Sequence, residues 1–110
     1  MTTTVVTVES DDEGLWWTLQ QLTSVSPLDS DFIEQCVAFG LVDLAGLPSQ
    51  WRFSPTVRLR LERAWRLHRD LEVHPSALPL VLQLLEEVEI LRQESSQLRQ
   101  RLRHWEDGHG

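Results

Sequence analysis

The sequence predicts a mainly α-helical protein with a small helix-turn-helix-like head, a minor β component and a long C-terminal helix. Three observations carry this prediction. Two short helical segments joined by a tight turn are indicated between Thr18 and Gly40. Ser54 followed by Pro55 is a strong helix start, because a proline at the first helical position loses no hydrogen bond. From residue 77 onward, apolar residues recur at alternating spacings of four and three, which is typical of a coiled coil.

The chain has 110 residues, enough for one small domain with an appended helix. "TTTVVTV" is rich in β-branched residues and suits a short strand, and "ESDDEG" suits a solvated acidic turn. We therefore expect an N-terminal strand and acidic turn over residues 1–14, a winged helix-turn-helix-like head over 15–74, a long dimerisation helix over 75–105 and a disordered tail over 106–110.

In the head, we expect one short helix to start near Thr18 and a second to be capped by Ser30. Gly40 is expected to end the second helix in a left-handed conformation. Trp16 and Trp17 are adjacent and cannot both point inward, so one of them is expected at the surface. The apolar positions of the second helix are Phe32, Ile33, Cys36, Val37 and Phe39.

The segment "LVDLAGLPSQWRF" is expected to form a small hairpin or wing, with β-like pieces at 41–44 and 50–53. The helix that begins at Pro55 is expected to run to about Asp70. Its apolar face comprises Val57, Leu61, Ala64, Trp65, His68 and Leu71, and its arginines fall mostly on the opposite, solvated face.

The charge of the chain is distributed unevenly. The net charge is −7, there is no lysine, and residues 1–51 contain eight acidic side chains but no Lys, Arg or His. A helix-turn-helix that reads DNA needs cations toward phosphates and base edges. The segment in the recognition-helix position, "DSDFIEQCVAFG", has three acids and no cation. This distribution disfavours DNA and favours a basic protein surface as the partner.

The long helix carries a heptad seam over four repeats. Val81, Val88 and Leu102 would take a positions and Leu84, Leu91 and Leu98 d positions, which favours a homodimer. In a parallel pair, Glu87 would face Arg92 and Glu94 would face Arg99 of the second copy. The alternative is a single amphipathic helix folded back on its own head. The candidate dimerisation residues are Leu84, Val88, Leu91, Leu98 and Leu102.

Several classes of chemistry find no support in the sequence. There is no glycine-rich phosphate loop, no paired histidine ligands and no Ser/His/Asp set. The single cysteine, Cys36, excludes an intrachain disulfide and is expected to be a small buried residue. We expect no catalytic residue, no cofactor and no metal. No segment has the pattern of a signal peptide or a membrane span, so a cytoplasmic protein is expected.

Residues 15–103 resemble the CbpM-type chaperone-modulator family within the MerR-like winged-helix superfamily. The most specific parts are "WRF", "RLHRDLEV" and "LVLQLLEEVEILRQES", followed by "LRQRL". The resemblance implies a small protein that binds the J-domain of a CbpA/DnaJ-like co-chaperone. By doing so, such a protein blocks the productive contact of the J-domain with a DnaK-type chaperone.

The helix of a J-domain that binds the chaperone is characteristically basic, so an acidic surface suits it. Our candidate partner-binding residues are Asp29, Asp31 and Glu34, together with Asp43; the simpler interpretation is that they cap and solubilise the helix. A second acidic patch, at Glu86, Glu87 and Glu89, could dock the partner instead. The alternative function is a MerR-like DNA-binding regulator that uses Arg52, Arg58, Arg60 and Arg63 on phosphates.

Overall fold

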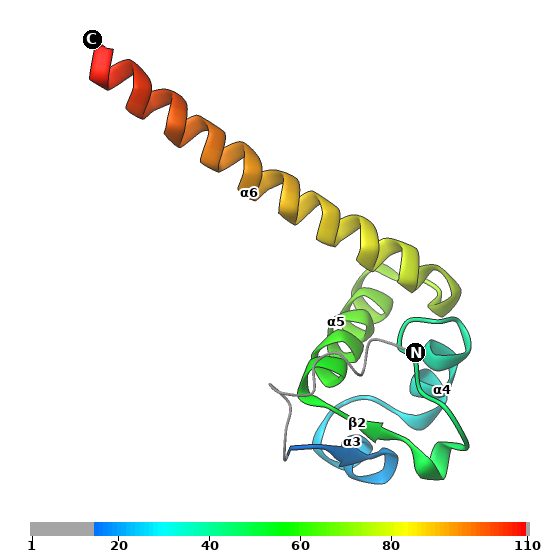
Figure 1. The fold of residues 1–110 in the computed structure, drawn as a ribbon. Coiled ribbons are helices and arrows are strands. Elements are labelled where there is room, and N and C mark those ends of the chain that lie inside the picture. Colours follow the sequence, from blue (N-terminus) through cyan, green and yellow to red (C-terminus); the bar gives the residue numbers. More distant parts are fainter. Residues whose placement is uncertain (1–14, 110) are drawn as a thin grey trace. The chain divides into compact units, whose positions relative to one another are not determined.

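A computed structural model describes residues 15–109 of the chain. The strand and acidic turn expected over residues 1–14 lie outside the described part. The chain divides into two units, a head that ends at Pro79 and the rest of the long helix from Leu80 onward. The elements, in order, are β1 (Trp17–Thr18), α3 (Leu19–Val25), α4 (Ser30–Ala38), the 3-10 turn η1 (Pro48–Gln50), β2 (Arg52–Phe53), α5 (Pro55–Leu71), the 3-10 turn η2 (Pro75–Ala77) and α6 (Leu78–His109) (Figure 1).

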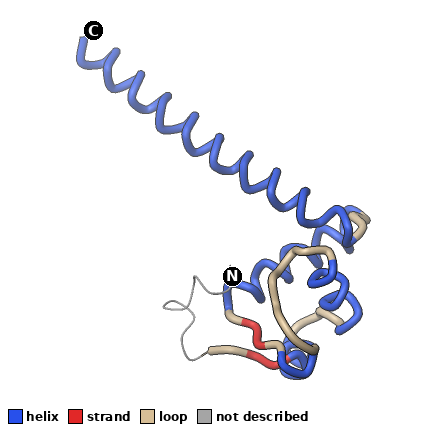
Figure 2. The backbone as a smooth tube through the Cα atoms, turned by 45° about the vertical axis from the view of Figure 1, so that its right-hand side comes forward, coloured by secondary structure: helices blue, strands red, loops and turns tan. Residues whose placement is uncertain are grey.

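The small sheet of the head consists of β1 and β2, which pair antiparallel with Trp17 opposite Phe53 (Figure 2). The expected hairpin between residues 41–44 and 50–53 is therefore wrong, although β2 lies within the second piece. The reason lies in the backbone groups of Leu41. Its N–H donates to the carbonyl of Cys36 at 2.9 Å, and its carbonyl accepts from Arg60 Nε at 2.9 Å. The N–H of Leu41 is thus engaged and cannot donate to a strand ladder.

The first two helix starts differ in how closely the sequence predicted them. α3 begins after Thr18 as expected, with a reciprocal capping box: Gln21 N–H donates to Thr18 Oγ1 at 3.1 Å, and Thr18 N–H donates to Gln21 Oε1 at 2.9 Å. α4 is capped by Asp29 rather than by Ser30, since Asp29 Oδ1 accepts from the N–H of Phe32 at 2.7 Å. The cap prediction at Ser30 is wrong by one residue because either side chain suits the position.

Other local predictions are confirmed. Gly40 follows α4 with φ 85° and donates its N–H to the carbonyl of Val37 at 3.1 Å. Ser54 caps α5, and Pro55 is its first residue. α5 ends at Leu71, and Glu72 takes the left-handed conformation, with φ 54°.

The core of the head lies between α3, α4, α5 and the two strands. Cys36 is fully buried as expected, and burial raises the pKa of its thiol to about 12, so the thiol stays protonated at neutral pH. Leu71 is exposed, which corrects its expected place on the buried face of α5. The buried apolar side chains of the head are Leu22, Leu28, Phe32, Ile33, Cys36, Leu41, Val42, Trp51, Phe53, Val57, Leu61, Ala64 and Leu78.

The long helix α6 is continuous from Leu78 to His109 (Figure 1). It starts after η2, which takes up Pro75–Ala77, and so begins slightly later than the sequence indicated. The tail expected to be disordered from residue 106 is helical as far as His109, so this prediction is corrected. Between residues 15 and 109, no helix combines the length and apolar character that crossing a membrane requires.

Candidate functional site

The exposed face of α4 is acidic. Phe32, Ile33 and Cys36 point into the core, which leaves the opposite side of the helix to solvent. Four exposed residues at positions i, i+3, i+4 and i+7 line that side, as one face of a helix requires. We call this set the α4 outer face; it consists of Asp31, Glu34, Gln35 and Ala38.

The structure brings together only some of the predicted partner-binding residues. Asp31 and Glu34 lie one turn apart on the α4 outer face, both exposed. Asp29 is exposed too, but its carboxylate caps the helix, as the simpler interpretation proposed for it. Asp43 is exposed in the segment after α4.

The second acidic patch lies on α6. Glu86 is half-buried, whereas Glu87 and Glu89 are exposed. The Glu87 carboxylate accepts from Gln83 Nε2 at 3.4 Å, a long contact. This patch therefore belongs to a different element from the α4 outer face.

An aromatic cluster orients α4 against α5. The ring of Phe32 meets Trp65 edge to face at 5.1 Å between centroids and lies 5.3 Å from the imidazole of His68. Nδ1 of His68 lies 2.9 Å from the carbonyl of Val73; because a carbonyl only accepts, His68 must donate there. Trp65 and His68 are half-buried, in keeping with their predicted place on the apolar face. These contacts fix which side of α4 faces outward.

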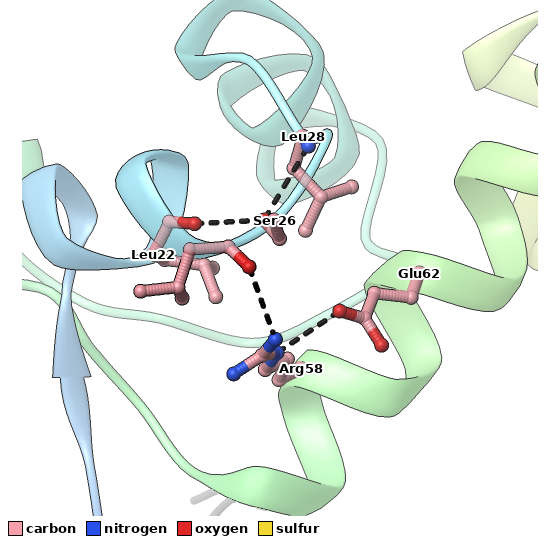
Figure 3. A network of polar contacts seen from close by, with 6 residues as sticks. Leu22, Ser26, Leu28, Arg58 and Glu62 are labelled. Atoms are coloured by element: carbon pink, nitrogen blue, oxygen red, sulfur yellow. Dashed lines mark hydrogen bonds and ion pairs between the residues drawn. The ribbon is translucent and has the colours of Figure 1, made fainter.

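Arg58 of α5 is engaged inside the head (Figure 3). Its Nε pairs with Glu62 Oε2 at 2.9 Å, and its Nη2 donates to the carbonyl of Val25 at 3.4 Å. Its guanidinium also lies over the ring of Trp17, 4.8 Å from the centroid, which is a cation–π distance. Arg58 therefore links α5 to β1 and to the end of α3.

Two further arginines that the DNA-binding alternative requires also bond within the head. Arg60 Nε donates to the carbonyl of Leu41 at 2.9 Å, and Arg52 Nη1 donates to the carbonyl of Trp51 at 2.8 Å. Arg63 is exposed. Three of the four arginines proposed for phosphate contacts thus have intramolecular partners, and the solvated-face prediction holds only for part of α5.

An open hollow of about 540 Å³ lies beside β1 and α3. Trp16 and Trp17 both border it; Trp16 is 37% exposed and Trp17 is half-buried, so the expected exposed tryptophan is Trp16. Sequence reasoning anticipated the exposed tryptophan but missed the hollow, for which the adjacent "WW" was the available signal. Its lining residues are Trp16, Trp17, Gln20, Gln21, Ser24 and Val25.

The predicted dimerisation residues all lie exposed along α6. Their side chains are between 42% and 62% exposed. A row of aliphatic side chains at heptad spacing is the kind of surface that a second helix covers. The row comprises Leu84, Val88, Leu91, Leu98 and Leu102.

Two short helices joined by a tight turn, a two-stranded sheet and a long following helix define a MerR-like helix-turn-helix protein. The family described as MerR HTH family regulatory protein matches residues 17–100. The chaperone modulatory protein CbpM of Pseudomonas entomophila (strain L48) is 36% identical over 85 residues, covering 76% of this chain and 84% of that protein. CbpM of Pseudomonas putida is 35% identical in strain W619 and 36% in strain GB-1, over the same shares.

The chain accordingly belongs to the family of CbpM chaperone modulatory proteins. Membership supports a chaperone-modulating role, and the relatives carry regulatory or modulatory names. No solved structure gives a significant match to the chain. Within the described residues, no three His, Cys, Asp or Glu side chains are grouped so that they could hold a metal ion.

The contacts of Arg58 give a first prediction. Replacing Arg58 by alanine removes an ion pair, a hydrogen bond and a cation–π contact, all partly exposed. The free energy of unfolding should fall by about 1–2 kcal/mol, measured by urea denaturation. Arg58→Lys is the matched control; it should recover only part of the loss, since an ammonium cannot pair and stack as a guanidinium does. Arg58→Ala with unchanged stability would contradict this role.

Proposed function

We propose that the chain binds the J-domain of a CbpA/DnaJ-like co-chaperone and inhibits its interaction with a DnaK-type chaperone. The α4 outer face is the proposed contact surface. The observation that carries the proposal is the acidic, exposed pair Asp31 and Glu34 in the position where a DNA-reading helix would present cations.

Charge complementarity supports a basic partner helix. Asp31 and Glu34 lie one helical turn apart, a spacing that matches cations one turn apart on a second helix. Complementary charges speed association and select the partner more than they raise affinity, so apolar contacts must supply much of the binding energy. A J-domain helix covered in this way is sterically unavailable to the chaperone. Inhibition therefore needs no catalysis and no cofactor.

The DNA-binding alternative is less well supported. It needs cations directed at phosphates, yet Arg58 and Arg60 donate to carbonyls or a carboxylate of the head. The acidic α4 outer face would also repel the phosphate backbone.

We also propose that the chain acts as a homodimer through α6. In a parallel pair, g and e positions of neighbouring heptads meet, which sets Glu87 against Arg92 and Glu94 against Arg99 of the second copy. Continuing the register sets Arg101 against Glu106, a third pair of opposite sign. An antiparallel pair instead places e against e, where Arg92 and Arg99 repel. Each exposed pair contributes only about 0.2–1 kcal/mol, but all three favour the same orientation.

Charge reversal tests the proposed surface. The double variant Asp31→Arg/Glu34→Arg should weaken J-domain binding about tenfold or more at low salt, with the effect shrinking as salt screens the charges. Isothermal titration against the J-domain of the co-chaperone from the same organism measures this. Asp29 is left in place because it caps α4.

The control for this experiment reverses an exposed acid of the second acidic patch, with Glu89→Arg, and should bind as the original chain does. If the control loses affinity while the α4 variant keeps it, the contact surface lies on the second acidic patch. That result would contradict the proposal for α4.

A substitution in the seam tests the dimer. Leu91→Arg places a charge at a d position and should shift the mass in sedimentation equilibrium from twice 12.8 kDa to 12.8 kDa. Gln93→Arg adds the same charge outside the seam and should leave the dimer intact. Glu94→Arg should weaken a parallel dimer, and adding Arg99→Glu should restore it. An original chain that sediments as a monomer at all concentrations would contradict the proposal.

A further inference from the structure

The hollow beside β1 and α3 has apolar walls and no charge. Trp16, Trp17 and Val25 supply indole and methyl surface, and the rest of the lining is amide or hydroxyl. None of its six lining residues is ionisable. Trp16 and Val25 remain 37% and 53% exposed. A hollow bordered by an exposed tryptophan has the composition of an interface hot spot, where a few aromatic anchors carry most of the binding energy.

The wall of the hollow is held in place before any ligand arrives. Arg58 lies over the ring of Trp17 and donates to the carbonyl of Val25, so one guanidinium fixes two of the lining residues. Glu62 pairs with Arg58 from one turn further along α5 and orients it. A surface that is already ordered loses less conformational entropy on binding, which favours its use as a docking site.

A hydrogen-bonded turn connects α3, which borders the hollow, to α4. Ser26 Oγ donates to the carbonyl of Leu22 at 2.7 Å and accepts from the N–H of Leu28 at 3.4 Å (Figure 3). Leu28 is buried. Val25 and Asp31, the nearer acid of the α4 outer face, are six residues apart, so their Cα atoms lie at most about 22 Å from each other. A partner helix of about 15 residues is about 22 Å long, enough to contact both sites.

We infer that this hollow takes an apolar or aromatic side chain from the same basic helix whose cations face Asp31 and Glu34. The uncharged lining favours an apolar group in the hollow. Asp31 and Glu34 follow the hollow in the sequence, and residues 15–51 contain no cation, so this part of the head favours basic residues of the partner next to that apolar group. The partner is thus an amphipathic basic helix with an apolar anchor. This inference rests on the proposed J-domain binding and locates its apolar contact.

Two substitutions in the lining test the inference, Trp16→Ala and Val25→Ser. Trp16→Ala should weaken binding of the J-domain about tenfold or more, and Val25→Ser about threefold. Both losses should be the same at low and high salt, because apolar burial is not screened, whereas the loss from Asp31→Arg/Glu34→Arg should shrink. Isothermal titration at two salt concentrations measures all three variants.

Leu59→Ala is the matched control, because Leu59 is 66% exposed on α5 and does not line the hollow. It should bind as the original chain does, and circular dichroism should show the same helix content in every variant. If the original chain binds the J-domain and both lining variants bind equally well, the hollow is not the anchor site and the proposed function stands. If the original chain does not bind, the proposed function fails and this inference falls with it.

Discussion

Carbonyl groups at the ends of α3 and just beyond α4 need hydrogen-bond donors, and the arginines of α5 supply them. The last carbonyls of a helix have no partner within it, and a small head has few elements that can cover them. Arg58 bonds to Val25, and Arg60 bonds to Leu41 across 19 residues of sequence. These bonds tie the first half of the head to α5. They also engage cations that a DNA-binding head would hold free for phosphates.

The charge pattern of the surface follows from this use of arginine. Residues 15–51 contain no cation, so every guanidinium that bonds to this half of the head comes from beyond residue 51. Asp31, in the first turn of α4, and Glu34 both stay exposed. α4 therefore keeps the geometry of a recognition helix while its outward charge is reversed relative to one that binds DNA. Together with membership of the CbpM family, this reversal supports a protein helix, rather than a duplex, as the partner.

Local features of the fold were predictable from sequence, and long-range ones were not. The helix start near Thr18, the cap at Ser54 and the left-handed Gly40 depend on neighbours within a few residues, so they were predictable from the sequence. The expected hairpin failed because β propensity says nothing about where the backbone groups of Leu41 find partners. The acids of the candidate site were predictable from composition. The hollow was not, because Arg58, which orders its wall, lies 33 residues from Val25.

The central claim is that this helix-turn-helix head recognises a basic protein helix and not DNA. Its most direct test is isothermal titration of the unmodified chain at low salt against two titrants, the J-domain of its co-chaperone and a palindromic DNA duplex. The account predicts a saturating complex with the J-domain and no heat of binding with the duplex. A duplex complex that weakens steeply with added salt, without any J-domain complex, would contradict it.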